Sequence, residues 1–500
     1  MKQKIKVVLN GKPILAEWGT TLSEITMGEK LCGGHGICGK CKVIAKGKLS
    51  EPTAAETRLL TENELSGGIR LACLTQAVGD CQIQTLSAVK ETQIATHGVL
   101  PKIKLDPTFS DYGVAVDIGT TTLVARLYNA EGSILAETSR VNPQCVWGAD
   151  VVSRIEAAIN GETELLSQAI RRALNEMITE FSAVIDTRKI DAVVITGNTV
   201  MLSLLAEQSL EPFSHAPFDV KQLFGQTFAA SKLSLSALQS DIPVYLPPCT
   251  SAFVGADITC AILATELYNN NTTMLVDIGT NGEMALWHNG RLTVCSTAAG
   301  PAFEGAGISV GMQAVKGAID KVTLQNGKLA AHVIGNIEPT GICGSGLIDA
   351  VACLVENGQV EQTGYLNGDK AFVAKNVALI QEDIRALQLA KSAIYAGVLT
   401  LIENQQLNFA DISSLLVAGG FGNYLNKESA AKIGLLPSEL TAVTRAVGNA
   451  AIGGAAMLLL DSTKKAVAQN LAQEANVLSL ATNSSFSENY MTGMLFGEQL

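Results

Sequence analysis

The chain has 500 residues, a formal net charge of -11, 47% hydrophobic residues and 17% charged residues. Its length exceeds what one hydrophobic core usually serves, so we expect a multidomain globular protein of α/β type. The negative charge argues against direct binding of nucleic acid, whose phosphates need clustered Lys and Arg. No apolar run reaches the roughly eighteen residues of a membrane-spanning helix, and the first residues lack a signal-peptide core, which favours a cytoplasmic protein without a membrane segment.

The first predicted elements are two strands of a hairpin. Apolar and polar residues alternate over residues 5–9, a turn follows at 10–11, and residues 14–18 return as the second strand. A cysteine-rich loop and a strand over residues 42–49 come next. This unit is expected to close near Leu86.

Four cysteines of this unit have the spacing of an iron-sulfur centre. Five residues separate Cys32 from Cys38, two separate Cys38 from Cys41, and 31 lie between Cys41 and Cys73. Glycines in the loop allow the backbone to wrap an inorganic core. A structural zinc site is the competing interpretation, but zinc ribbons usually present two close pairs and this chain has one. Cys81 is an alternative ligand, although a small buried thiol is the favoured interpretation.

The loop CGGHGICGKC resembles the [2Fe-2S] ferredoxin family, and its first gap of five residues resembles the adrenodoxin-like branch. The resemblance implies an α+β ferredoxin-like (β-grasp) domain over residues 1–88 that carries single electrons. Only ten residues separate Thr21 from Cys32, fewer than in the helix-bearing segment of such domains. We therefore expect an open flank beside the cluster.

A linker over residues 89–110 is predicted to lead into a new domain, because periodicity is lost and Gly and Pro recur. An apolar strand at 113–117 then ends in DIGTTT, followed by two strands around a turn at 129–132. A long helix is predicted to bury an apolar stripe and to leave its other side in solvent. The stripe consists of Leu166, Ile170, Ala173, Leu174, Met177, Phe181 and Val184, with Arg171, Arg172 and Glu180 off it.

The same opening recurs 160 residues later. An apolar strand at 274–277 runs into DIGTNGE and a second pair of strands. Near the end, the segment 413–422 repeats the pattern of an apolar strand followed by glycines, and a helix is expected within 447–460. These repeats predict an internal duplication.

An apolar strand that ends in Asp-Ile-Gly-Thr suits a site for magnesium and phosphate. The aspartates, Asp117 and Asp277, can each hold a metal-bound water, and the loop residues can donate backbone and hydroxyl hydrogens to phosphate. The loop residues are Gly119, Thr120, Thr121 and Thr122 in the first copy, and Gly279, Thr280, Asn281 and Gly282 in the second. The alternative is two catalytically inert turns.

The duplicated loops resemble the superfamily of actin, sugar kinases, acetate kinase and heat-shock chaperones. The resemblance implies an α/β ATPase of two RNase-H-like halves, residues 111–270 and 271–465, with a C-terminal tail, 466–500, packed on it. By this resemblance Asp117 and Asp277 position Mg²⁺ and the attacking water, and Glu283 assists. The turn VAGGFG, with Gly419 and Gly420, flanks the adenosine of ATP.

Two further segments have alternative interpretations. Glu304 in AGPAFEG either faces the cleft or belongs to a plain turn, and residues 341–346 either open a helix near the nucleotide or form a turn. The remaining cysteines show no ligand spacing and are predicted to be small buried hydrophobes. They are Cys145, Cys249, Cys260, Cys295, Cys343 and Cys353.

Taken together, the motifs resemble one family closely, the reductive activators of corrinoid enzymes. The segments GADVVSRI, GNTVM, AGPAFEG, GICGSGLID and VAGGFG all look like those of that family, although Ser203 stands where a His is expected. The resemblance implies ATP-dependent reduction of Co(II) to Co(I), a corrinoid-protein partner, a low-potential electron donor and a homodimer. The rival hypotheses are a small-molecule kinase that carries the cluster as a sensor, and a ferredoxin-type reductase with a regulatory ATP-binding domain.

Overall fold

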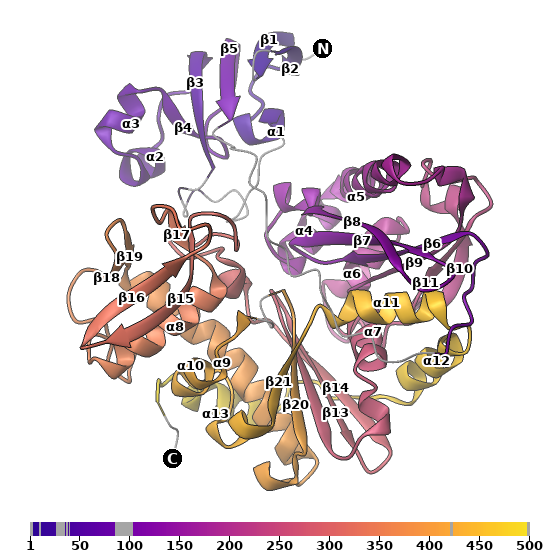
Figure 1. Ribbon diagram of the computed structural model, residues 1–500. Helices are drawn as coiled ribbons and strands as arrows, with labels where there is room; N and C mark the ends of the chain where they lie inside the picture. The colour runs from indigo at the N-terminus through magenta and orange to yellow at the C-terminus, as the bar shows by residue number, and fades with distance from the viewer. Residues whose placement is uncertain are drawn as a thin grey trace.

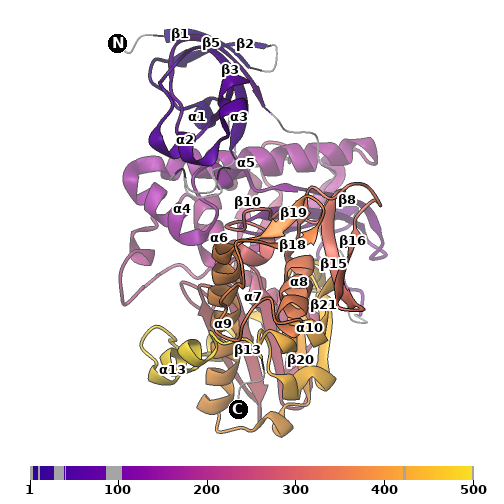
Figure 2. The same ribbon diagram turned by 90° about the vertical axis from the view of Figure 1, so that its left-hand side faces the viewer.

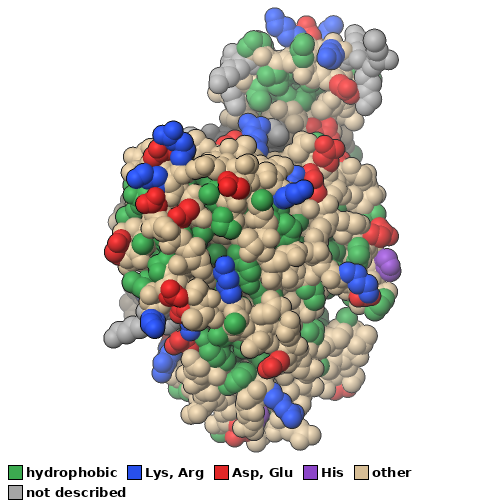
Figure 3. Space-filling model, turned by 90° about the vertical axis from the view of Figure 1, so that its right-hand side faces the viewer, with side chains coloured by type: hydrophobic (Ala, Val, Ile, Leu, Met, Phe, Trp, Pro, Cys, Tyr) green, Lys and Arg blue, Asp and Glu red, His purple; other side chains and the backbone are tan. Residues whose placement is uncertain are grey.

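The computed structural model describes residues 4–9, 12–26, 36, 39, 41–85, 104–420 and 424–497. An N-terminal unit stands apart from a larger body made of two lobes (Figure 1). On the face shown in Figure 3, side chains of both charges are interspersed over the body, and the N-terminal unit forms a separate lobe. Within the described ranges, no helix has the length and apolar character needed to cross a membrane.

An open five-stranded sheet forms the N-terminal unit. Its elements are β1 (Lys4–Leu9), β2 (Lys12–Glu17), α1 (Leu22–Thr26), β3 (Lys42–Leu49), α2 (Ala54–Leu59), α3 (Glu62–Ser66), β4 (Ile69–Leu71) and β5 (Ala77–Thr85). The strand order is β2-β1-β5-β3-β4, with β1 parallel to β5 and the other pairs antiparallel. Alternate residues such as Val7 and Val43 face a small core with Leu22. The expected hairpin and the strand at 42–49 are confirmed.

The first lobe of the body is a six-stranded sheet with helices on both sides. Its strands are β6 (Tyr112–Ile118), β7 (Thr122–Asn129), β8 (Ile134–Val141), β9 (Ile190–Gly197), β10 (Gln226–Ala229) and β11 (Pro243–Leu246). Its helices are α4 (Val151–Ala157), α5 (Thr163–Glu180), α6 (Thr199–Leu205) and α7 (Ala256–Ala264). The order across the sheet is β10-β11-β9-β6-β7-β8.

The second lobe repeats this plan and adds smaller sheets. Its main strands are β12 (Thr273–Ile278), β13 (Gly282–His288), β14 (Arg291–Thr297), β20 (Ser414–Ala418), β21 (Thr444–Gly448) and β22 (Asn476–Val477). The added strands are β15 (Ala318–Gln325), β16 (Lys328–Val333), β17 (Gly341–Ile342), β18 (Ala371–Ala374) and β19 (Val377–Leu379). The helices are α8 (Gly344–Glu356), α9 (Gln381–Asn404), α10 (Lys427–Lys432), α11 (Ala450–Leu460), α12 (Lys464–Glu474) and α13 (Ser484–Thr492).

The two lobes share one strand order. The run β8-β7-β6-β9-β11 corresponds to β14-β13-β12-β20-β21, and the parallel and antiparallel pairs fall at the same places. The central strands β6 and β12 both end at a DIGT loop. The internal duplication expected from the sequence is therefore present in the backbone.

Two packed helices, α7 and α11, lie between the lobes (Figure 1). The two helices pack so closely that a Cβ on Gly454 would lie 1.9 Å from the carbonyl oxygen of Cys260. The C-terminal end of α11 also binds the segment that precedes β6. The backbone N–H groups of Asp106 and Thr108 donate to the carbonyls of Leu460 and Leu459, each at 2.9 Å.

The predicted linker over residues 89–110 differs from the structure at its C-terminal end. Residues 104–110 pack on the body, and Phe109 is buried there with 8% of its surface exposed. The Gly and Pro content of the segment predicted a linker. The apolar ring of Phe109 nevertheless anchors its C-terminal end, because burying the ring in the core of the body is favourable. Residues 86–103 lie outside the described residues.

The long helix α5 confirms most of the predicted apolar stripe, with two differences. Val184 follows the helix and is exposed. Arg171, predicted off the stripe, is buried, because its Nε donates to the carbonyl of Leu205 at 3.0 Å and its aliphatic part packs inside. Towards the C-terminus, β22 adds to the second sheet beside β14, and α13 packs against α9 (Figure 2).

Candidate functional site

A cavity between the lobes collects most of the residues singled out from the sequence. It lies where β6 and β12 end, and both halves line it. The predicted site residues that line it are Asp117, Gly119, Thr120, Thr121, Thr122, Asp277, Gly279, Thr280, Asn281, Glu283, Gly419 and Gly420. Gly282 is outside this lining. It pairs with Thr297 in the β13–β14 ladder, and a Cβ there would lie 2.3 Å from Ile394 Cδ1, so close packing accounts for this glycine.

The two strand-end aspartates occupy equivalent places with different neighbours. Asn449 caps α11 and donates from Nδ2 to Asp117 Oδ2 at 2.9 Å, so a helix of the second lobe holds the aspartate of the first. Glu283 pairs with Asp277 across the β12–β13 ladder, whereas Val124 takes the equivalent place opposite Asp117. The site is symmetric in its backbone and asymmetric in its charge.

Asp257 is a functional candidate that sequence reasoning missed. It lies in the first turn of α7 and lines the same cavity. The signal that could have located it is a Val-Gly pair, residues 254–255 and 447–448, which precedes both α7 and α11. Because the lobes are duplicated, the start of α7 had to approach the cavity as the start of α11 does.

The carboxyl groups of the cavity are held in a low-dielectric environment. Burial raises the pKa of Asp117 to about 6. Burial, with repulsion from neighbouring carboxylates, raises the pKa of Asp257 to about 7 and that of Asp277 to about 8. The pKa of Glu283 is raised well above its ordinary value, chiefly by burial. Such a group of acids favours a divalent cation.

Direct ligation of a metal by these carboxylates is not indicated. Among the described residues, no three His, Cys, Asp or Glu side chains are arranged to hold one metal ion. Mg²⁺ retains several of its waters in many phosphate sites. Carboxylates at such a site therefore need not ligate the ion directly.

The first DIGT loop turns tightly and is fixed from behind. The N–H of Gly119 donates to the carbonyl of Thr122 at 3.0 Å, and a Cβ on Gly119 would lie 2.6 Å from that oxygen. Glycine is therefore required there. Asn142, which does not line the cavity, donates from Nδ2 to the Gly119 carbonyl and from its backbone N–H to the Thr121 carbonyl, both at 2.8 Å.

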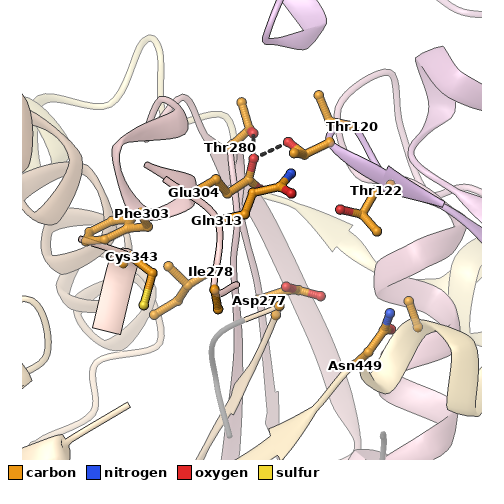
Figure 4. A pocket seen from close by; sticks show the side chains of 18 of the residues that line it. Thr120, Thr122, Asp277, Ile278, Thr280, Phe303, Glu304, Gln313, Cys343 and Asn449 are labelled. Atoms are coloured by element: carbon orange, nitrogen blue, oxygen red, sulfur yellow. Dashed lines mark hydrogen bonds between the residues drawn. The ribbon is translucent and has the colours of Figure 1, made fainter. Parts of the chain in front are cut away.

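Glu304 joins the loops of the two lobes. Thr280 donates from Oγ1 to Glu304 Oε2 at 2.9 Å, and the hydroxyl of Thr121 donates to the same oxygen. Figure 4 shows the Glu304 carboxylate between Thr280 and the first loop, which Thr120 marks. Burial raises the pKa of Glu304. Of the two interpretations of AGPAFEG, the structure therefore favours the one in which Glu304 faces the cleft.

Two further segments that line the cavity are rich in glycine. Gly419 has a φ of +111°, and a Cβ there would lie 2.3 Å from the Ile278 carbonyl, so only glycine fits. Cys343 precedes α8 and lines the cavity with Ser345. The segment 341–346 therefore opens a helix at the site, as one of its two interpretations predicted.

Two of the four predicted cluster ligands are within the described residues, and they adjoin each other. Cys41 Sγ and Cys73 Sγ are 3.2 Å apart and share a hydrogen bond, so the fold brings these two thiols together, as a common ligand set requires. Cys32 and Cys38 lie outside the described residues. Cys81 faces the core of the sheet, and burial raises the pKa of its thiol, as expected of a small buried residue.

A buried carboxylate fixes the turn that carries Cys73. Glu56 accepts from Arg70 Nε at 3.0 Å and Nη2 at 3.1 Å, from the N–H of Leu71 at 3.0 Å and from Thr75 Oγ1 at 2.8 Å. Burial opposes ionisation of Glu56, but these hydrogen bonds keep its pKa below the ordinary value. Because its partners flank Cys73 on both sides, Glu56 sets the position of this thiol.

The other cysteines are buried, as predicted. They are Cys145, Cys249, Cys260, Cys295, Cys343 and Cys353. Ser203 is also buried and donates to the Thr199 carbonyl at 2.8 Å, within its own helix α6. It does not reach the cavity lining.

Two sheets of one strand order, joined by packed helices around a cavity with paired strand-end aspartates, define a protein of the ASKHA class. Residues 271–499 match the C-terminal domain of RACo, the ASKHA domain, and residues 112–270 match the RACo middle region. The chain belongs to the family of reductive activators of corrinoid proteins. The family resemblance drawn from the motifs is thereby confirmed.

Relatives agree over most of the chain. The corrinoid activation enzyme RamQ of Eubacterium limosum is 35% identical over 428 residues, which cover 78% of this chain and 71% of the relative. The Co(II) methylated amine-specific corrinoid protein reductase of Methanosarcina barkeri is 26% identical over 421 residues, with 78% and 77% covered. The solved structure of a reductive activator for corrinoid, iron-sulfur protein aligns with a TM-score of 0.73 at 27% identity and covers 98% of both chains.

Proposed function

We propose that this chain reactivates a corrinoid protein by reducing its cobalt from Co(II) to Co(I) with one electron from a low-potential donor, while ATP is hydrolysed to ADP and phosphate. The names of the relatives support the corrinoid substrate. The observation that carries the proposal is the presence of two machineries in one chain. These are the paired thiols Cys41 and Cys73, and the strand-end aspartates Asp117 and Asp277 at one cavity.

Coupling to ATP has an energetic reason. Plant-type [2Fe-2S] centres have potentials near about -400 mV, and for one electron each ~59 mV of uphill gap costs about 1.4 kcal/mol. A gap of roughly 200 mV therefore costs about 5 kcal/mol. Closure of the lobes around a nucleotide is suited to supply free energy of this size.

We take residues 1–88 to be a β-grasp ferredoxin domain. The strand order β2-β1-β5-β3-β4 and the adjoining thiols of Cys41 and Cys73 support this assignment. Together with Cys32 and Cys38 they would hold a [2Fe-2S] cluster, which when bound supplies one-electron transfer. The chain's own contribution is to orient the thiols, as Glu56 does for the turn of Cys73.

In the body we assign roles by position. The loop residues 119–122 and 279–281 donate hydrogens to the phosphates, and Gly419 and Gly420 flank the adenosine. Asp117 and Asp277 orient the water shell of Mg²⁺, which when bound offsets the phosphate charge. Glu283, whose raised pKa favours uptake of a proton, assists the attack of water.

The division of the chain follows from these roles. We propose lobes over 111–270 and 271–465 that form the ATPase, with the segment 104–110 packed on the body before the first lobe, and a tail over 466–500 that packs on the ATPase. We further propose that the protein acts in the cytoplasm as a homodimer.

The test reconstitutes the full chain anaerobically with iron and sulfide and follows Co(I) absorbance of a corrinoid protein with titanium(III) citrate as reductant. We expect Co(I) to form with MgATP, and not without it or with a non-hydrolysable ATP analogue. Asp277→Asn should abolish the ATP-dependent part and leave the EPR signal of the cluster unchanged. Asp186→Asn, at an exposed aspartate paired with Arg188, should behave as the wild type.

The rival hypotheses predict other outcomes. Equal Co(I) formation without ATP contradicts the coupling and favours a reductase with a regulatory ATP-binding domain. Phosphoryl transfer from ATP to an added metabolite, with no effect of ATP on electron flow, favours a kinase that carries the cluster as a sensor.

A further inference from the structure

Four arginine side chains of the described residues are buried, and three of them have a carboxylate partner. The pairs are Arg70 with Glu56, Arg126 with Glu137, and Arg171 with Glu207. Arg154 in α4 is the exception. None of its surface is exposed, and no ion pair recorded among the described residues includes it.

Among the described residues, the guanidinium of Arg154 donates hydrogen bonds to neutral acceptors alone. Its Nε donates to the Gly148 carbonyl at 3.2 Å, and its Nη1 lies 3.3 Å from Met201 Sδ. Its Nη2 donates to the Thr120 carbonyl at 2.5 Å. Thr120 belongs to the first DIGT loop and lines the cavity, whereas Arg154 does not. Arg154 therefore lies directly behind the loop.

This buried charge requires an anion nearby. An unpaired buried charge is costly, because desolvation removes its hydration without replacing it. Burial lowers the pKa of Arg154 to about 10, so the side chain is charged at neutral pH. Two carboxylates that form no ion pair with Arg154 favour its charged form: Asp150, which caps α4, and Glu304, which Thr121 and Thr280 bond across the loop. The chain thus places an acidic group, Glu304, on the cavity side of the loop.

The loop itself is shaped by the same contacts. The carbonyls of Gly119, Thr120 and Thr121 are all bonded by groups outside the cavity, from Asn142 and Arg154. With its carbonyls held there, the loop can present N–H and hydroxyl groups to a ligand in the cavity.

We propose that Arg154 is a positioning residue of the nucleotide site, which holds the first phosphate loop from behind and supplies the positive charge that favours phosphate in front of it. The inference rests on the proposed function, because it takes the phosphates of ATP as the ligand. It assigns to the buried charge of GADVVSRI a role in recognising the anionic part of the nucleotide, separate from recognition of adenosine.

The test measures binding of MgATP and of adenosine to the full chain by calorimetry, for the wild type, Arg154→Met and Arg154→Lys. Loss of a charge-assisted contact should weaken MgATP binding of Arg154→Met by roughly 10- to 100-fold. Adenosine binding should stay within about twofold, since adenosine carries no phosphate. Arg154→Lys keeps the charge and should recover most of the MgATP affinity.

Arg171→Met is the matched control. Arg171 is also buried, lies in the same lobe and also donates to a backbone carbonyl, but it does not line the cavity or hold the loop. The Arg171→Met variant should lower the melting temperature, as Arg154→Met does, and leave the affinities for MgATP and adenosine unchanged.

Three results would overturn the inference. They are unchanged MgATP binding by Arg154→Met, an equal loss of adenosine binding, and an equal loss of MgATP binding by Arg171→Met. If Arg154→Met does not fold, the ratio of MgATP to adenosine affinity in Arg154→Gln against Arg171→Gln decides, and equal ratios overturn it. A wild type that binds adenosine but not MgATP contradicts the proposed function itself, which separates the two failures.

Discussion

At the scale of single residues, the carboxyl groups that line the cavity are costly to ionise in the folded chain. Asp117, Asp257 and Asp277 each have a raised pKa because burial disfavours their ionised forms. In a folded chain without a cation, ionisation of these groups opposes folding. Mg²⁺ with a nucleotide would relieve this opposition, so binding and stability are linked at these residues.

Asp277→Asn should stabilise the chain increasingly as the pH rises. The pKa of Asp277 is about 8 in the folded state against an ordinary 3.8, so the folded state binds the proton more tightly. The stability that this proton contributes is full below pH 3.8 and is lost as the pH rises towards 8. The Asp277→Asn variant has no titrating group at this position, so it does not lose this stability as the pH rises. Between pH 5 and 8 its gain over the wild type should grow by at most about 4 kcal/mol.

The measurement is thermal or urea unfolding in buffers free of divalent cations and nucleotide. Asp186→Asn serves as the control, because hydrogen bonds from Arg188 keep the pKa of Asp186 at about 2 and it is ionised throughout this range. A gain that is constant between pH 5 and 8 contradicts the argument.

At the scale of elements, the contact of α7 with α11 decides how the lobes meet. A Cβ on Gly454 would lie 1.9 Å from the backbone oxygen of Cys260, which cannot move without moving α7. In α9, a Cβ on Gly397 would meet the end of the flexible Met284 side chain at 2.6 Å, and Leu480 Cδ1 at an ordinary contact distance of 3.9 Å. An added Cβ would thus meet rigid backbone at Gly454 and a movable side chain at Gly397.

Gly454→Ala should therefore destabilise the chain more than Gly397→Ala. Overpacking against backbone typically costs about 1–3 kcal/mol, whereas an alanine in a helix gains up to about 1 kcal/mol over glycine where space can be made. Melting curves of both variants test this. The expectation fails if Gly397→Ala has the lower melting temperature.

Much of the fold could be predicted from local patterns. The strands that end at Asp117 and Asp277 follow from apolar runs before DIGT, and the stripe of α5 follows from its periodicity. The repetition of DIGT predicted the duplication, whereas placement of the two loops at one cavity was implied by the resemblance to the superfamily of actin and sugar kinases.

Other features depend on contacts between distant segments. Burial of Arg171 requires the Leu205 carbonyl, and the approach of Asp257 to the cavity requires the packing of α7 on α11. Neither partner is marked in the local sequence. Gly282 was assigned to the phosphate loop by its place in DIGTNGE, but its packing against Ile394 depends on α9, more than one hundred residues away in the sequence.

At the scale of the whole molecule, the thiols of Cys41 and Cys73 and the cavity between the lobes lie in parts of the chain with separate hydrophobic cores. Leu22 and Val43 belong to the core of the N-terminal unit, and the clusters of the two lobes do not include them. Each machinery should therefore survive the loss of the other.

Cys73→Ser should remove the EPR signal of the reconstituted cluster and leave MgATP binding unchanged. Cys81→Ala is the matched control, because Cys81 packs in the core of the same sheet, and it should retain the signal. EPR and calorimetry on the same samples give both results. Loss of MgATP binding in Cys73→Ser, or loss of the signal in Cys81→Ala, contradicts the separation of the two machineries.

The helix α11 connects the cavity with the segment through which the N-terminal unit joins the body. Its first end holds Asp117 through Asn449, and its last carbonyls hold Asp106 and Thr108, where the chain from the N-terminal unit joins the body. A helix of this length is a stiff rod of about 16 Å. We therefore expect a ligand that displaces Asp117 to shift Asp106 and Thr108 at the other end of the rod as well, and with them the point at which the N-terminal unit is attached to the body.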